Sequence, residues 1–110
     1  MNVIKNIFAI LLVSITFSGI AQTSKKYTEI NFRVEGNCGM CEKRIENALD
    51  IKGVKLADWN VKTKNCRVVF KNTVITEEEI HKIIAKEGHT TEMVKATKED
   101  YDNLHGCCKY

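Results

Sequence analysis

Residues 29–49 read EINFRVEGNCGMCEKRIENAL, and the spacing of their apolar side chains changes from that of a strand to that of a helix. Over residues 29–35 apolar side chains alternate with polar ones, which predicts a half-buried strand. From Cys41 onward apolar residues recur at helical spacing, so we expect a helix that begins near Cys41 and stops before Gly53. The two patterns meet at a loop with two glycines and two cysteines, and this loop is the first candidate site.

Downstream of this loop the sequence predicts four more elements. Thr76 and Glu79 have the spacing of a capping box at the start of a second helix, which Gly88 closes. The other predicted elements are strands over residues 54–61, 66–70 and 89–94, with a turn over residues 62–65 between the first two. This order predicts a ferredoxin-like α+β sandwich, with a four-stranded antiparallel sheet and both helices on one face.

The first residues of the chain have the pattern of a secretory signal peptide. One lysine precedes an apolar run over residues 7–13, and small residues lead to Ala21, after which we expect cleavage. An uncleaved membrane anchor is the alternative, although the run is short for a bilayer crossing. The predicted divisions are a signal peptide (1–21), a linker (22–28), one compact domain (29–95) and a cysteine-containing tail (96–110).

Charge and cysteine content narrow the function classes. The formal net charge is +3 and the lysines are scattered, so neither nucleic acid nor an anionic membrane surface is implied as a partner. All five cysteines follow Ala21, and an oxidising compartment would normally pair them. An odd number cannot pair completely, so at least one thiol is free, metal-bound or joined to another molecule.

Cys38 and Cys41 form the principal candidate site. One lies on the loop and the other in the first turn of the helix, so both sulfurs can turn toward one ion. The helix N-terminus, with Lys43 and Arg44 close in sequence, favours thiolate over thiol. Two thiolates suit copper(I) first and mercury(II) second, whereas zinc, a further alternative, usually takes four ligands. A plain disulfide between the two cysteines is the structural alternative.

At this loop the chain resembles the heavy-metal-associated domain family. That family includes small copper chaperones, the metal-binding repeats of copper-transporting P-type ATPases and the periplasmic mercury-binding protein of mercury-resistance systems. The resemblance covers residues 29–95 and implies that Cys38 and Cys41 ligate the ion. It rests on GNCGMCE at residues 36–42, on Ile45, Leu49, Gly53 and Val54, and on Val68, Phe70 and Gly88.

Two positions depart from the family pattern. Gly36 stands where the family usually has a methionine that packs beneath the metal loop, which predicts a looser loop. Gly36 and Gly39 are also expected to allow close backbone approach and to adopt positive φ. His89 stands where bacterial members often carry an aromatic residue, and because a histidine can ligate, His89 is an additional candidate ligand.

The remaining candidate residues each have a functional and a structural interpretation. Cys107 or Cys108 in the tail would add a third thiolate to the ion, or the tail would be a disordered end with disulfides. Cys66 is expected in the core, with a coordinating or disulfide role as the alternative. Trp59 is expected to be buried against the sheet, with an exposed partner contact as the alternative. His81 is expected in solvent, on the polar face of the second helix.

The leading hypothesis is a protein without enzymatic activity that binds copper(I) and delivers it, for example to a membrane metal transporter. A mercury(II) scavenger has the same geometry. The other classes are a thiol–disulfide redox protein, disfavoured because the chain has no proline to line such a site, and a disulfide-stapled interaction module. We expect a monomer, with a metal- or disulfide-linked dimer as the alternative, and the resemblance to bacterial relatives implies the periplasm.

Overall fold

The computed structural model describes residues 26–110, so the predicted signal peptide (1–21) and residues 22–25 of the linker lie outside the described residues. The elements are β1 (Thr28–Arg33), α2 (Gly39–Ala48), β2 (Val54–Trp59), β3 (Asn65–Phe70), α3 (Glu77–Lys86), α4 (Lys98–Asp102) and the 3₁₀ helix η2 (Gly106–Cys108). Up to residue 88 these are the predicted elements, with bounds shifted by a few residues. Between residues 26 and 110 no helix has the length and apolar character needed to cross a membrane.

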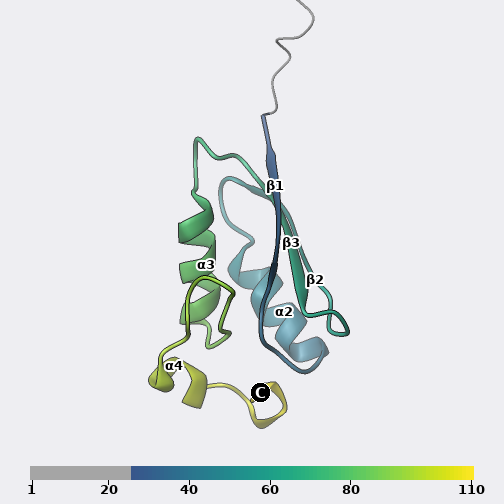
Figure 1. Ribbon diagram of the computed structural model, residues 1–110, viewed down its shortest axis with the longest axis vertical. Helices are drawn as coiled ribbons and strands as arrows, with labels where there is room; N and C mark the ends of the chain where they lie inside the picture. Colours follow the sequence, from purple (N-terminus) through teal and green to yellow (C-terminus); the bar gives the residue numbers. More distant parts are fainter. Residues whose placement is uncertain (1–25) are drawn as a thin grey trace, which may run out of the picture.

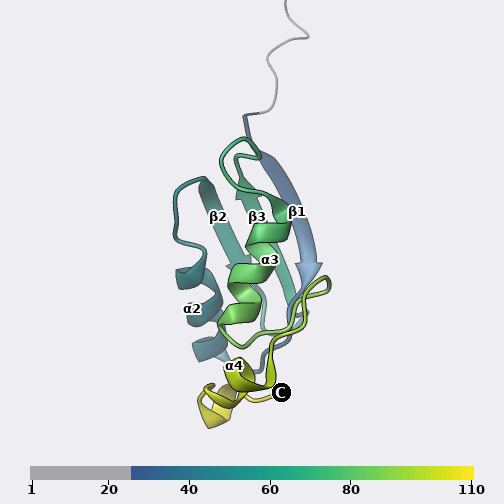
Figure 2. The same cartoon turned by 90° about the vertical axis from the view of Figure 1, so that its left-hand side faces the viewer.

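The three strands form one antiparallel sheet in the order β1-β3-β2. Cys66 of the central strand is in register with Phe32 on one side and Trp59 on the other. Both α2 and α3 cover the same face of this sheet (Figures 1 and 2), which is the predicted ferredoxin-like α+β architecture. The core between the two layers includes Phe32, Val34, Cys41, Ile45, Leu49, Trp59, Cys66, Val68, Phe70, Ile80 and Ile84.

The predicted fourth strand over residues 89–94 is wrong. Within the described part of the chain, only Val34 and Thr91 pair there, as a single antiparallel bridge. Thr91 Oγ1 accepts hydrogen bonds from the backbone N–H of Met93 at 3.2 Å and of Val94 at 3.0 Å. A side chain that satisfies nearby backbone donors in this way competes with a strand ladder. The chain therefore turns after Thr91 and leaves the sheet.

The second helix begins and ends as predicted. Thr76 Oγ1 accepts a hydrogen bond from the Glu79 N–H at 3.1 Å, and the Glu79 carboxylate accepts one from the Thr76 N–H at 3.4 Å. At the other end Gly88 has φ +99°, and a Cβ there would lie 2.6 Å from the Asp100 carbonyl oxygen of α4. Position 88 thus requires glycine both for its φ and because α4 packs directly on it.

The expectation that His81 lies in solvent is also wrong. Its side chain is fully buried, its ring centroid lies 4.0 Å from that of Phe32, and its Nδ1 lies 2.6 Å from Thr91 Oγ1. The Thr91 turn that ends the sheet therefore covers this face of α3. Burial lowers the pKa of His81, because the protonated ring loses its hydration.

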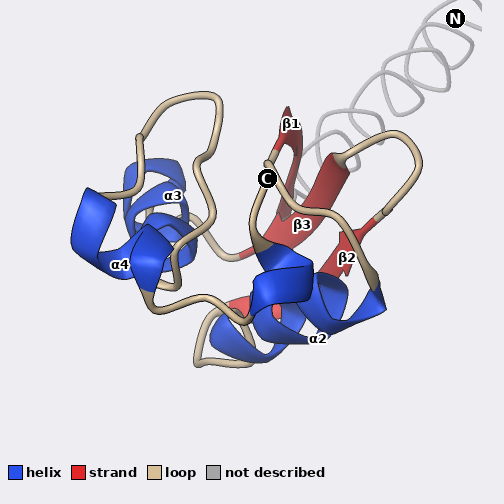
Figure 3. Ribbon diagram, turned by 90° about the horizontal axis from the view of Figure 1, so that it is seen from below, coloured by secondary structure: helices blue, strands red, loops and turns tan. Residues whose placement is uncertain are grey.

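The tail forms an ordered part of the domain. After α4 the chain crosses one end of the molecule and reaches the N-terminus of α2 (Figures 1 and 3). There η2 packs against α2, and Leu104 and Cys108 are buried. The alternative of a disordered tail is wrong, because short apolar anchors hold it on the domain.

Candidate metal site

Cys38 and Cys41 stand at the start of α2. Cys38 is the N-cap residue, and its carbonyl oxygen accepts hydrogen bonds from the N–H of Cys41 at 3.0 Å and of Glu42 at 3.2 Å. Cys41 is fully buried and Cys38 is half-buried. The two Sγ atoms lie 3.6 Å apart. The spacing of the two cysteines therefore brings both sulfurs to one point, as predicted.

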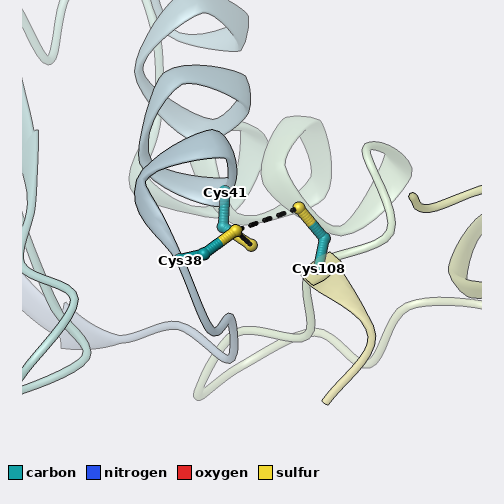
Figure 4. Close-up of side chains that lie close together, drawn as sticks. All are labelled: Cys38, Cys41 and Cys108. Atoms are coloured by element: carbon teal, nitrogen blue, oxygen red, sulfur yellow. Dashed lines mark hydrogen bonds between the residues drawn. The ribbon is translucent and has the colours of Figure 1, made fainter. Parts of the chain in front are cut away.

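Two more thiols reach this point from the tail. Cys108 Sγ lies 3.9 Å from Cys38 Sγ, and the sulfurs of Cys38, Cys41 and Cys108 all lie within 4.8 Å of one another (Figure 4). Cys107 is exposed, with its Sγ 3.5 Å from Cys38 Sγ and 3.7 Å from Met40 Sδ. All five cysteines of the chain are free thiols. The structure thus joins both tail cysteines to the predicted pair.

The thiols of this cluster differ in how readily they ionise. The pKa of Cys38 is lowered to about 7, chiefly by the backbone N–H of Cys41 at the helix start. The pKa of Cys107 is raised, mainly by its hydrogen bond to Cys38, and that of Cys108 is raised by burial. Cys38 is therefore more readily ionised than either tail thiol. The positive charge of the ion then favours ionisation of the neighbouring thiols.

The basic side chains near the loop have structural partners. Arg44 donates a hydrogen bond from Nη2 to the Glu87 carbonyl oxygen at 3.0 Å, which joins α2 to the end of α3. Lys64 donates from Nζ to the Gly36 carbonyl oxygen, and its Nζ lies 5.6 Å from the ring centroid of Trp59. The lowered pKa of Cys38 thus comes chiefly from the helix N-terminus, and neither Lys43 nor Arg44 is among its causes.

Trp59 fills the space beneath the loop that Gly36 leaves open. A Cβ at position 36 would lie 3.0 Å from two atoms of the Trp59 ring and 3.2 Å from Cys41 Cβ. Trp59 is buried, and its Nε1–H donates to the Val34 carbonyl oxygen at 3.1 Å. The loop is therefore packed from below, contrary to the prediction of a looser loop. Close approach is the reason for Gly36, since neither Gly36 nor Gly39 has a positive φ.

Two further predicted residues lie outside the thiol cluster. His89 is buried, and its Nδ1–H donates to the Glu35 carbonyl oxygen at 2.7 Å. It does not belong to the group of ligand atoms around Cys38 in the described chain. Cys66 is buried in the core, as predicted, and burial raises its pKa to about 12.

Reasoning from the sequence missed Tyr110, which anchors the tail. Its hydroxyl donates to the Gly88 carbonyl oxygen at 2.7 Å and accepts from the Thr90 N–H at 2.9 Å. The Tyr101 hydroxyl in turn donates to the main-chain oxygen of Tyr110 at 2.6 Å. The signal in the sequence was an aromatic residue two positions after the cysteine pair, at the end of a polar tail.

The family sequence model for the heavy-metal-associated domain matches residues 31–90, more than half of the 110 residues. The chain belongs to the heavy-metal-associated domain family. It is a heavy-metal-binding domain whose cysteine cluster includes Cys38 and Cys41, in a family that is not enzymatic. Among curated proteins no sequence matches this one. The family match ends at residue 90, so the tail cysteines and Tyr110 lie beyond it.

Solved structures share the fold of this heavy-metal-associated domain. The CopZ metallochaperone is 27% identical with a TM-score of 0.56, over 58% of this chain and 98% of that chain. A copper binding domain from HMA7, a P-type ATPase, is 30% identical with a TM-score of 0.56, over 58% of this chain and 89% of that chain. Oxidized MerP from Ralstonia metallidurans CH34 is 20% identical with a TM-score of 0.56, over 60% of this chain and 94% of that chain, and shows the fold alone.

Proposed function

We propose that this domain binds copper(I) through Cys38 and Cys41 and delivers it to a partner protein. The observation that carries the proposal is the 3.6 Å separation of the two Sγ atoms at the start of α2, where the pKa of Cys38 is lowered to about 7. Converging thiolates suit a soft ion of low coordination number. The similarity to a metallochaperone and to a copper binding domain supports copper as that ion.

The donor atoms favour copper(I) over zinc. Within the described residues three sulfurs all lie within 4.8 Å of one another, those of Cys38, Cys41 and Cys108, whereas a closed zinc site usually takes four ligands. The thiol of Cys107 is exposed and lies outside this group. Mercury(II) remains the second candidate, because it binds the same two thiolates. A direct competition between copper(I) and mercury(II) for the protein separates these two ions.

Delivery proceeds by exchange of thiolate ligands with the partner. Cys38 is half-buried and the neighbouring Met40 is 45% exposed, so the thiols of another protein can reach the ion from solvent. The expected partner is a membrane metal transporter with its own cysteines. The predicted signal peptide supports export, and the periplasm is the proposed compartment. The mass of the protein recovered from a periplasmic fraction tests this, with cleavage after Ala21 as the expected result.

The function is tested by anaerobic titration of the reduced protein with copper(I) against a competing chelator. We expect tight one-to-one binding by the wild type and its loss in the Cys38→Ser/Cys41→Ser variant. Cys66→Ala removes a buried thiol outside the group of Cys38, Cys41 and Cys108 and is expected to bind as the wild type does. Absence of tight binding by the wild type would refute the carrier function and leave an interaction module as the explanation.

A further inference from the structure

The tail places two thiols beside a site that two thiolates suffice to form. We propose that Cys108 is the third ligand of the transported ion and that Tyr110 is the residue that positions it. This inference rests on the proposed function, because it requires the ion at Cys38 and Cys41. It concerns a segment that the match to the family does not include.

The distances between the sulfurs fit a trigonal ion. With metal–sulfur bonds of about 2.3 Å, the two sulfurs of a linear ion stand about 4.6 Å apart, and those of a trigonal ion about 4.0 Å apart. Cys38 Sγ lies 3.6 Å from Cys41 Sγ and 3.9 Å from Cys108 Sγ. The cluster therefore reaches trigonal geometry with smaller movements than Cys38 and Cys41 need for a linear ion.

Burial distinguishes Cys108 from its neighbour Cys107. The side chains of Cys108 and Cys41 are both fully buried, so two of the three proposed sulfur ligands are shielded from water. Cys107 is exposed and lies beside Met40 on the solvent side of Cys38. Adjacent side chains rarely converge on one ion, so one of the two is the resident ligand. Because Cys108 is buried and Cys107 is exposed, we assign Cys108 as this ligand.

Tyr110 anchors the chain two residues beyond Cys108. Its hydroxyl bonds the Gly88 carbonyl oxygen and the Thr90 N–H, which lie on the loop after α3. Its ring meets that of Tyr101 edge-on, with 4.9 Å between the centroids. These contacts connect the end of the tail to the body of the domain.

A second anchor lies next to the site itself. The side chain of Asn37, which precedes Cys38, donates a hydrogen bond to the Lys109 carbonyl oxygen, which follows Cys108. The loop and the tail are thereby joined at the residues that flank the two thiols. A tethered ligand acts at an effective concentration on the order of millimolar or higher, so Cys108 competes well with free thiols.

The third thiolate changes how the ion is delivered. A thiol of the partner loses its proton and forms a bond to copper as the bond between copper and Cys108 Sγ breaks. Cys108 then takes up a proton, and copper remains copper(I) throughout. The tail thus occupies the coordination position that the partner needs, and its displacement limits the rate of transfer.

The test combines X-ray absorption spectroscopy, which counts sulfur neighbours of the bound ion, with chelator competition and stopped-flow release. We expect three sulfurs in the copper(I)-loaded wild type. Cys108→Ser is expected to show two sulfurs, at least about tenfold weaker binding and faster release. Tyr110→Phe is expected to keep three sulfurs and to release copper(I) about three- to tenfold faster, since it loses the hydrogen bonds of the hydroxyl to Gly88 and Thr90. The matched controls are Cys66→Ala and Tyr27→Phe, since Tyr27 directly precedes β1 and its ring lies beside Lys55 and Lys71.

Each result has a separate meaning. Two sulfurs in the wild type, with no change in Cys108→Ser, would overturn the third ligand and leave the copper(I) carrier intact. A loss of sulfur in Cys107→Ser and not in Cys108→Ser would overturn the assignment to Cys108. Release from Tyr110→Phe at the rate of Tyr27→Phe would overturn the positioning role. Only a wild type without tight copper(I) binding would refute the proposed function itself.

Discussion

Cys38 at the N-cap of α2 and Cys66, the second residue of β3, carry thiols with opposite properties. Cys38 is half-buried at a helix N-terminus, and its pKa is lowered to about 7. Cys66 is fully buried between Phe32 and Trp59 in the sheet register, and its pKa is raised to about 12. The same residue type is thus a metal ligand candidate in one region and a small apolar core residue in the other.

The difference arises from what each element does with its backbone N–H groups. The first N–H groups of a helix have no partner within the helix, so they can stabilise a thiolate. The N–H groups of a central strand are used by the neighbouring strands and offer nothing to a side chain. Cys38 at the helix start therefore gains reactivity, whereas desolvation, together with the carboxylates of Glu46 and Asp58, raises the pKa of Cys66 in the sheet.

The largest expected effect is on thiol alkylation at pH 7 in the reduced, metal-free protein. With a pKa of about 7, Cys38 is about half ionised, whereas Cys66 with a pKa of about 12 is ionised on the order of one part in 100,000. Peptide mass spectrometry after brief labelling should find Cys38 modified and Cys66 unmodified. In denaturant the two should react alike. Equal labelling of Cys38 and Cys66 in the folded protein would contradict the predicted difference between their pKa values.

Copper(I) is expected to stabilise the fold only through the α2 site. At a free copper(I) concentration a thousand times the dissociation constant, binding adds about 4 kcal/mol to the free energy of unfolding. Thermal unfolding should show this gain in the wild type and in Cys66→Ala. The Cys38→Ser/Cys41→Ser variant should show none. A gain that Cys66→Ala abolishes would place a ligand in the core instead.

Serine substitutions should lower the free energy of unfolding much more at Cys66 than at Cys38. Cys66→Ser buries a hydroxyl without a partner and is expected to lower the free energy of unfolding by about 1–3 kcal/mol. Cys38→Ser puts a preferred residue at an N-cap and is expected to change it by less than about 0.5 kcal/mol. Urea unfolding of the metal-free, reduced variants measures both values. A larger loss from Cys38→Ser would mean that its thiol has a structural role.

The smallest expected effect is that of pH on the free energy of unfolding, through the buried His81. The pKa of His81 is lowered by burial, so below about pH 6.5 the unfolded chain binds a proton that the folded chain does not. The contribution of His81 to the free energy of unfolding is therefore fully present above this pH. It is lost on acidification, by at most about 1.4 kcal/mol per pH unit. Urea unfolding at pH 7.5 and 5.5 should show a smaller loss for His81→Gln than for the wild type. An unchanged loss in His81→Gln would contradict the prediction.

Local sequence patterns predicted the helices and strands up to residue 88 and the two cysteines of the loop, Cys38 and Cys41. The capping box of Thr76 and Glu79 and the spacing of Cys38 and Cys41 involve neighbours within one helical turn, so sequence distance and spatial distance agree. The errors at Thr91 and His81 have one cause. The Thr91 side chain binds backbone groups nearby and the ring of His81, and neither contact follows from periodicity.

By itself the sequence determined the order of elements, the two-cysteine loop and the burial of Cys66, because hydrophobic spacing and capping act over short distances. Only the tertiary structure decided that Trp59 fills the space at Gly36 and that Cys108 meets Cys38, 70 residues away along the chain. Contacts of this kind depend on where a turn redirects the chain. Here the turn at Thr91 ends the sheet early and sends the tail to the start of α2, where Tyr110 anchors it.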